Sequence, residues 1–171
     1  MNKNILKIWG FIALIMATMA CSPEEPRPLE EAASRAELLT GTWQINQAIQ
    51  VDENAKFKGF PAEVTYKDIT NILPEHPYTD FAITFNANGS YAVAKGRSLV
   101  QVPDTEGTWA LDDDTYSSAV LLKGANGDEM QLDIIDIEGL RYAEPATRTI
   151  QLGLVRYLDG KAFLSYLYHM V

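Results

Sequence analysis

The sequence predicts an all-β protein whose strands follow one another as an antiparallel meander. Stretches of alternating apolar and polar residues recur between residues 41 and 170, and turn-forming Gly, Asn and Asp separate them about every ten residues. The turns include Asn88-Gly89, Ala125-Asn126-Gly127 and Asp159-Gly160. These residues adopt the backbone angles of tight hairpins easily, so the flanking strands are expected to pair antiparallel.

The elements can be placed in order along the chain. Ala and Leu in residues 30–39 predict a short helix that ends before the first strand. In that strand, TWQINQAIQV, we expect Trp43, Ile45, Ile49 and Val51 to share one face. Hairpins are predicted over residues 80–94, 118–135 and 147–170, with a further short strand at 106–111.

One long segment, residues 52–80, interrupts this pattern after the first strand. It contains three prolines, and several apolar residues are spaced more like a helix than a strand: Val64, Ile69, Ile72 and Leu73. Loops of this length in a compact domain usually carry function or cover a core. We expect a covering lid with a short helix, and a functional loop is the alternative.

Composition and charge limit the partners. A chain of 171 residues with 47% hydrophobic and 22% charged residues is expected to form one globular domain. Its net charge is −9, and removal of Lys3 and Lys7 with the first twenty residues would lower it by two. Such an acidic protein lacks the basic surface that binds nucleic acid, and its overall charge disfavours adsorption to anionic lipid. The single cysteine excludes an intramolecular disulfide and a cysteine-based zinc site.

The N-terminus has the features of a lipoprotein signal peptide. Its first residues include Lys3 and Lys7, and the apolar run 8–20 is shorter than the roughly 20 residues that a membrane-spanning helix needs. The run leads into TMACS, which resembles a bacterial lipobox in which Thr18 and Met19 replace the usual Leu and small residue. We therefore expect removal of residues 1–20 and acylation of Cys21. The alternative is an ordinary secretory signal that leaves Cys21 as a free thiol.

Residues 21–37 are predicted to form a disordered tether. The stretch SPEEPRPLEE, residues 22–31, holds three prolines and four glutamates, so it cannot bury apolar area. Acidic residues after a lipidated cysteine also resemble a signal for export to the cell surface, with a plain solvated linker as the alternative. The folded domain is expected over residues 38–171, anchored in the outer membrane on its periplasmic face or at the cell surface.

The predicted helix precedes a GTW motif at residues 41–43, a second GTW lies at residues 107–109, and FNANGSY forms a predicted hairpin. Through these features residues 38–171 resemble the lipocalin-like domains found in lipoproteins of unknown function from Gram-negative bacteria. The resemblance implies an up-and-down barrel of about eight strands, whose interior holds packed side chains or one small ligand. It also implies that Trp43 packs against an arginine from the last strands, for which Arg156 is the candidate.

Two sets of side chains are candidates for binding. The inward face of the barrel is expected to be either plain core or the wall of a ligand site. Its ligand-binding candidates are Trp43, Phe81, Ile83, Phe85, Tyr91 and Trp109, and Ile45, Val93 and Leu111 lie on the same face. The last strand carries large apolar groups on both faces. Tyr166 and Tyr168 are expected either to be covered locally or to form a partner surface.

The sequence offers no recognisable catalytic or metal centre, and no cofactor is expected. His76 lies in a proline-bracketed loop, His169 lies near the C-terminus, and no serine has the glycines of a nucleophile elbow. The three aspartates at residues 112–114 fit an acidic hairpin turn better than a Ca²⁺ loop. The carboxylates at residues 133, 136 and 138 are expected to face solvent rather than to act as a glycosidase pair. We therefore predict a protein that is not an enzyme.

Two functions follow from these features. The first is a lipid-anchored envelope lipoprotein whose lipocalin-like domain binds a small apolar or amphipathic molecule. The second is a non-catalytic interaction subunit that docks on an outer-membrane uptake or secretion complex through its last strand and long segment. The barrel interior distinguishes them, because a cavity of roughly a few hundred Å³ favours ligand binding and a filled interior favours docking.

Overall fold

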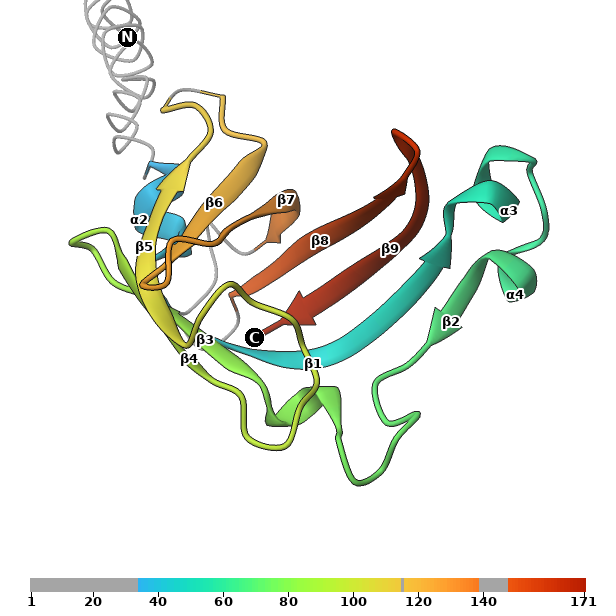
Figure 1. Cartoon of the computed structure of the whole chain (residues 1–171), viewed down its shortest axis with the longest axis horizontal. Coiled ribbons are helices and arrows are strands. Elements are labelled where there is room, and N and C mark those ends of the chain that lie inside the picture. Colours follow the sequence, from blue (N-terminus) through green and yellow to red (C-terminus); the bar gives the residue numbers. More distant parts are fainter. Residues whose placement is uncertain (1–33, 115, 139–147) are drawn as a thin grey trace, which may run out of the picture. The chain divides into compact units, whose positions relative to one another are not determined.

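The computed structural model describes residues 34–114, 116–138 and 148–171 as strands with a few short helices (Figure 1). None of the helices in these ranges is long and apolar enough to cross a membrane. The predicted signal peptide and Cys21 lie outside the described residues. The elements, in chain order, are α2 (Arg35–Leu39), β1 (Gly41–Asp52), α3 (Glu53–Phe57), α4 (Ala62–Thr65), β2 (Tyr66–Asp68), the 3₁₀ helix η1 (Tyr78–Asp80), β3 (Ala82–Phe85), β4 (Ser90–Ala94), β5 (Glu106–Leu111), β6 (Ala119–Gly124), β7 (Glu129–Glu138), β8 (Thr149–Leu158) and β9 (Lys161–Met170).

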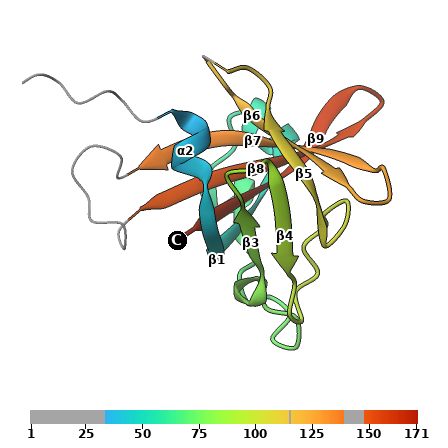
Figure 2. The same cartoon turned by 90° about the vertical axis from the view of Figure 1, so that its left-hand side faces the viewer.

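The strands form a closed antiparallel barrel (Figures 1 and 2). Strands β3 to β9 pair with their neighbours in sequence order, and β1 closes the ring by pairing with both β3 and β9. Strand β2 pairs with the second half of β1 and stands outside this ring of eight strands. The prediction of an all-β, up-and-down barrel of about eight strands is therefore confirmed.

The three predicted hairpins are present as β3–β4, β6–β7 and β8–β9. The β8–β9 turn shows why an Asp-Gly sequence predicts a tight hairpin turn. Its two central residues, Asp159 and Gly160, have φ angles of +49° and +73°. Few residue types other than Gly, Asn and Asp adopt such angles readily, so a short Asp-Gly stretch between two strands indicates the turn directly.

The first strand contains a β-bulge at Asn46. Ile45 pairs with Met170 whereas Gln47 pairs with His169, so Asn46 is an extra residue on β1. An extra residue interrupts the ladder and reverses the alternation of the side chains beyond it.

This bulge corrects the predicted face of the first strand. Trp43 and Ile45 lie in the barrel core as expected, but Ala48 continues that face and is also in the core. Ile49 and Val51 therefore lie on the opposite face, beside the place where α3 contacts β1 and β9. The expectation that all four apolar residues share one face is wrong, because strict alternation does not continue through a bulge.

One end of the barrel is closed by α2 and Trp43. The indole Nε1 donates a hydrogen bond to the carbonyl oxygen of Leu39 at 2.7 Å. The guanidinium of Arg148 lies over the indole, 5.1 Å from the ring centre, and donates to the carbonyl oxygen of Thr40 at 3.1 Å. The arginine expected at this place was Arg156, which lies instead near the far end of β8.

Helix α2 begins at Arg35, within the segment predicted to be tether. The Ser34 hydroxyl accepts from the backbone N–H of Glu37 at 3.2 Å, and the Glu37 carboxylate accepts from the backbone N–H of Ser34 at 2.8 Å. This capping box satisfies amide groups that the first helical turn leaves unpaired. Residues 34–37 of the predicted tether therefore form this cap and the first residues of the helix, and residues 30–33 of the predicted helix lie outside the described ranges.

The long segment contains more structure than the sequence indicated. It forms α3, α4, β2 and η1 rather than one loop with one helix. Of its expected covering residues only Ile69 is buried, whereas Val64, Ile72 and Leu73 are 61%, 46% and 51% exposed. The segment covers the core mainly through Ile69 and Tyr78, and its other large apolar residues are exposed.

Candidate functional site

The side chains predicted to line the barrel interior are buried together in one cluster. All six ligand-binding candidates are at most 9% exposed and belong to one buried cluster: Trp43, Phe81, Ile83, Phe85, Tyr91 and Trp109. Phe85 and Trp109 meet edge to face, with ring centres 5.3 Å apart. Ile45 is buried with them, and Val93 and Leu111 pack against the cluster. The inward orientation is confirmed, and a role in ligand binding stays a prediction.

Tyr166 and Tyr168 of the last strand form a stack with Tyr78. The ring centres of Tyr166 and Tyr168 are 6.4 Å apart, and those of Tyr78 and Tyr168 are 6.3 Å apart. Tyr168 is 6% exposed, and burial raises its pKa above the ordinary tyrosine value. Of the two possibilities for this strand, the structure shows local cover at Tyr168, so this ring offers no exposed surface to a partner.

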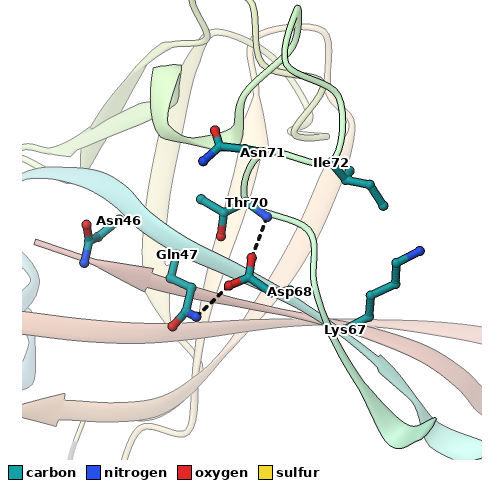
Figure 3. Close-up of a pocket in the computed structure, with 7 residues that line it drawn as sticks. All are labelled: Asn46, Gln47, Lys67, Asp68, Thr70, Asn71 and Ile72. Carbon is teal, nitrogen blue, oxygen red and sulfur yellow. Dashed lines mark hydrogen bonds between the residues drawn. The ribbon is translucent and has the colours of Figure 1, made fainter. Parts of the chain in front are cut away.

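Two adjoining hollows lie on the outer face of the sheet, around the bulge. The larger, of about 570 Å³, lies between β1 and the chain around the end of β2, where its polar lining residues are Asn46, Gln47, Lys67, Asp68, Thr70 and Asn71 (Figure 3). The smaller, of about 290 Å³, extends over β7, β8 and β9, where Asp136, Thr149, Gln151 and His169 are its further polar residues. Because Asn46 and Gln47 line both hollows, we treat the two hollows as one surface, the polar groove.

Hydrogen bonds hold one wall of the polar groove in place. Gln47 Nε2 donates to Asp68 Oδ2 at 2.9 Å, and the backbone N–H of Thr70 donates to Asp68 Oδ1 at 2.9 Å (Figure 3). The Thr70 hydroxyl accepts from the backbone N–H of Ala48 at 3.0 Å. The hydrogen bonds from Gln47 and Thr70 lower the pKa of Asp68, so its carboxylate is ionised at neutral pH.

Other polar groups of the groove remain open to a partner. Among the described residues, the side chains of Asn46, Asn71, Thr149 and Asp136 form no hydrogen bond with another side chain or with the backbone, and Lys67 forms no ion pair. Asparagine amides donate and accept, threonine does both, and the aspartate accepts. The arrangement suits recognition of polar groups.

The polar groove was not predicted from the sequence. Its residues come from segments far apart in the chain, at 46–47, 67–72, 136, 149–151 and 169–171, which the pairing of β1 with β2 and β9 brings together. One local signal was present. Asn46-Gln47 places two polar residues in succession between Ile45 and Ala48, and such a break in alternation is what a bulge produces.

Two further candidates of the sequence, His76 and Asp112, are held in hydrogen bonds. His76 Nδ1 lies 2.9 Å from the carbonyl oxygen of Arg97. Asp112 accepts from the hydroxyl of Ser118 at 2.6 Å and from its backbone N–H at 2.8 Å, and these bonds, with one from Ala119, lower the pKa of Asp112 to about 2. In the part of the chain that the structure describes, no three His, Cys, Asp or Glu side chains are placed to hold a metal ion.

The fold defines the class of protein: a small closed antiparallel β-barrel with a packed aromatic core and a polar groove on its outer face. Residues 28–171 match a family described as a domain of unknown function (DUF5004), and the chain belongs to this family. Comparison with curated proteins and with solved structures gives no match.

Proposed function

We propose that this domain is a non-catalytic interaction subunit, held at the outer membrane by acyl chains on Cys21, that binds a protein partner through the polar groove. The observation that carries the proposal is the distribution of free space. The barrel interior is occupied by its own side chains, whereas the outer face has adjoining hollows of about 570 and 290 Å³. Binding outside the barrel therefore requires no rearrangement of the core.

The chemistry and origin of the groove residues support this docking mode. Thr70 and Asn71 come from the long segment and His169 comes from the last strand, the two parts of the chain expected to dock. The carboxylates of Asp68 and Asp136 outnumber the single lysine in the groove. The groove thus suits a polar, neutral or basic segment of an outer-membrane uptake or secretion complex rather than a phosphate-rich partner.

A second candidate function is the carriage of a small apolar or amphipathic ligand inside the lipocalin-like barrel that the resemblance to Gram-negative lipoproteins implies. The packing of Arg148 over Trp43 at the closed end favours this resemblance. A ligand inside the barrel would have to displace buried side chains such as Phe85 and Tyr91, which are 0% and 2% exposed. We therefore place docking first.

The membrane anchor is tested by the variant Cys21→Ala. Cys21 is the only cysteine of the chain, so its removal eliminates every site of thiol acylation. We expect loss of metabolic palmitate labelling and weaker retention in the membrane fraction, because the acyl chains that would hold the protein stably are lost with the thiol. Palmitate labelling that is absent from the wild type, or unchanged in Cys21→Ala, would show that the lipobox interpretation is wrong.

The docking site is tested by filling the groove with Asn46→Trp. Asn46 is exposed and lines both hollows, so an indole there occupies the groove without entering the core. We expect at least about tenfold less partner protein in affinity purification from detergent-solubilised membranes. The matched control is Leu121→Trp, an exposed strand residue on β6 that does not line the groove. Equal recovery of the partner with both variants would contradict docking at the groove.

A further inference from the structure

Two turns at the same end of the long strands expose large apolar side chains. Figure 1 shows α3, α4 and the β8–β9 turn together at this end of β1, β8 and β9. Phe57 is 91% exposed and Leu158 is 62% exposed. We call this set the apolar tip; its members are Phe57, Phe60, Val64, Tyr66, Tyr157, Leu158 and Phe163.

Packing holds the two turns of the apolar tip in a fixed relation. Helix α3 packs against β9, and the Ser165 hydroxyl of β9 donates to the Glu53 carboxylate of α3. Ala55 of α3 is 4% exposed, so this helix has a buried side while Phe57 at its end faces solvent. Single exposed apolar residues are ordinary, but a group on one fixed surface indicates an interface.

The chain segments that carry the apolar tip are less acidic than the rest of the domain. Residues 52–68 and 156–163 carry five basic and five acidic side chains, whereas the other described residues carry five basic and thirteen acidic ones. Some of the acids are already engaged, because Asp52 caps α3 and Glu53 pairs with Lys56 at 3.6 Å. Among the described residues, Lys58 and Lys161 form no ion pair.

We propose that the apolar tip binds the surface of a phospholipid bilayer, with its aromatic and aliphatic side chains in the interface and Lys58 and Lys161 beside the headgroup phosphates. Phe and Leu bury apolar area at the acyl boundary, tyrosine spans the apolar and wet zones, and lysine is attracted to anionic lipid. The acidity of the remaining surface repels the same headgroups, so the tip is the part that faces the membrane.

The length of the chain before the domain permits this contact. Thirteen peptide units separate Cys21 from Ser34 and reach at most about 45 Å when extended, whereas β1, which runs from α2 to the tip, is about 40 Å long. A lipid on Cys21 and the apolar tip can therefore contact one bilayer together. Only this step rests on the proposed lipidation.

The test uses the mature chain, residues 21–171, with Cys21→Ser so that no lipid anchor contributes. Vesicles of phosphatidylethanolamine and phosphatidylglycerol are sedimented with this protein, with Phe57→Ser/Leu158→Ser, and with the control Tyr116→Ser/Leu121→Ser. All four positions are exposed, so both variants keep the core intact. We expect the tip variant to lower the partition coefficient at least about tenfold and the control to leave it within about twofold. Absent vesicle binding, or equal loss in both variants, overturns the proposal.

A second measurement locates the contact. In the Cys21→Ser chain, Phe57→Cys or Leu121→Cys supplies the only thiol for an environment-sensitive dye. We expect the dye emission to shift to shorter wavelength with vesicles at residue 57 and to stay unchanged at residue 121. If the dye at residue 57 does not respond while the protein forms dimers that the tip variant abolishes, the tip is a self-association surface and the proposal is wrong. Failure of Cys21 acylation would appear in palmitate labelling and would leave both measurements unaffected.

Discussion

The variant Gly107→Ala is expected to lose more than about 3 kcal/mol of its free energy of unfolding. A Cβ atom at this position would lie 2.1 Å from the carbonyl oxygen of Lys123 and 2.8 Å from Cε1 of Tyr91. It would also lie 3.0 Å from the Cα of Gly124. Gly107 pairs with Tyr91 on β4 and with Gly124 on β6, so relief of the clash requires β5 to move away from a neighbouring strand.

Urea unfolding followed by circular dichroism measures this loss, with Gly127→Ala as the matched control. A Cβ at Gly127 meets no atom within 4 Å, but the φ of +90° is strained for alanine. We expect the control to lose only about 1–3 kcal/mol, from backbone strain alone. If Gly107→Ala unfolds at the same urea concentration as Gly127→Ala, the close approach of β5 and β6 is not as the structure places it.

The variant Trp43→Ala is expected to lose about 3–5 kcal/mol. Trp43 is 2% exposed, donates a hydrogen bond to the Leu39 carbonyl at 2.7 Å, and carries the Arg148 guanidinium over its ring. Truncation therefore creates a cavity at the closed end, leaves the Leu39 carbonyl oxygen without this donor, and removes the cation–π contact.

Thermal unfolding of three variants separates these contributions. Trp43→Phe keeps an aromatic ring but loses the indole N–H, so we expect it to lie between Trp43→Ala and the wild type. Tyr116→Ala, at a residue that is 85% exposed, should change the free energy of unfolding by less than about 0.5 kcal/mol. A Trp43→Ala variant as stable as Tyr116→Ala would show that Trp43 does not close the barrel.

The hairpins were predictable because their determinants are local. Asp159-Gly160 specifies its turn through its own backbone preferences, and the alternation in β3 and β4 places Ile83 and Phe85 on the inner face without further information. The bulge at Asn46 was not predicted, because it depends on how β1 pairs with β9. The same reason explains the arginine over Trp43, since the choice between Arg148 and Arg156 is set by which end of β8 lies beside α2.

The candidate site was less predictable than the fold. Apolar alternation marks an inner face, and that signal led to the core residues rather than to a binding surface. The polar groove joins Asn46 of β1 to Thr149 of β8 and His169 of β9, and polar residues at such positions look like any solvated strand face. Only the three-dimensional register shows that they surround one hollow.

The most direct test of binding at the outer face is mass spectrometry of the native lipoprotein purified from membranes in mild detergent. Docking at the polar groove predicts a protein partner in stoichiometric amount, lost with Asn46→Trp and kept with Leu121→Trp. A small apolar molecule retained in stoichiometric amount, with no accompanying protein, would contradict it and place the binding site inside the barrel.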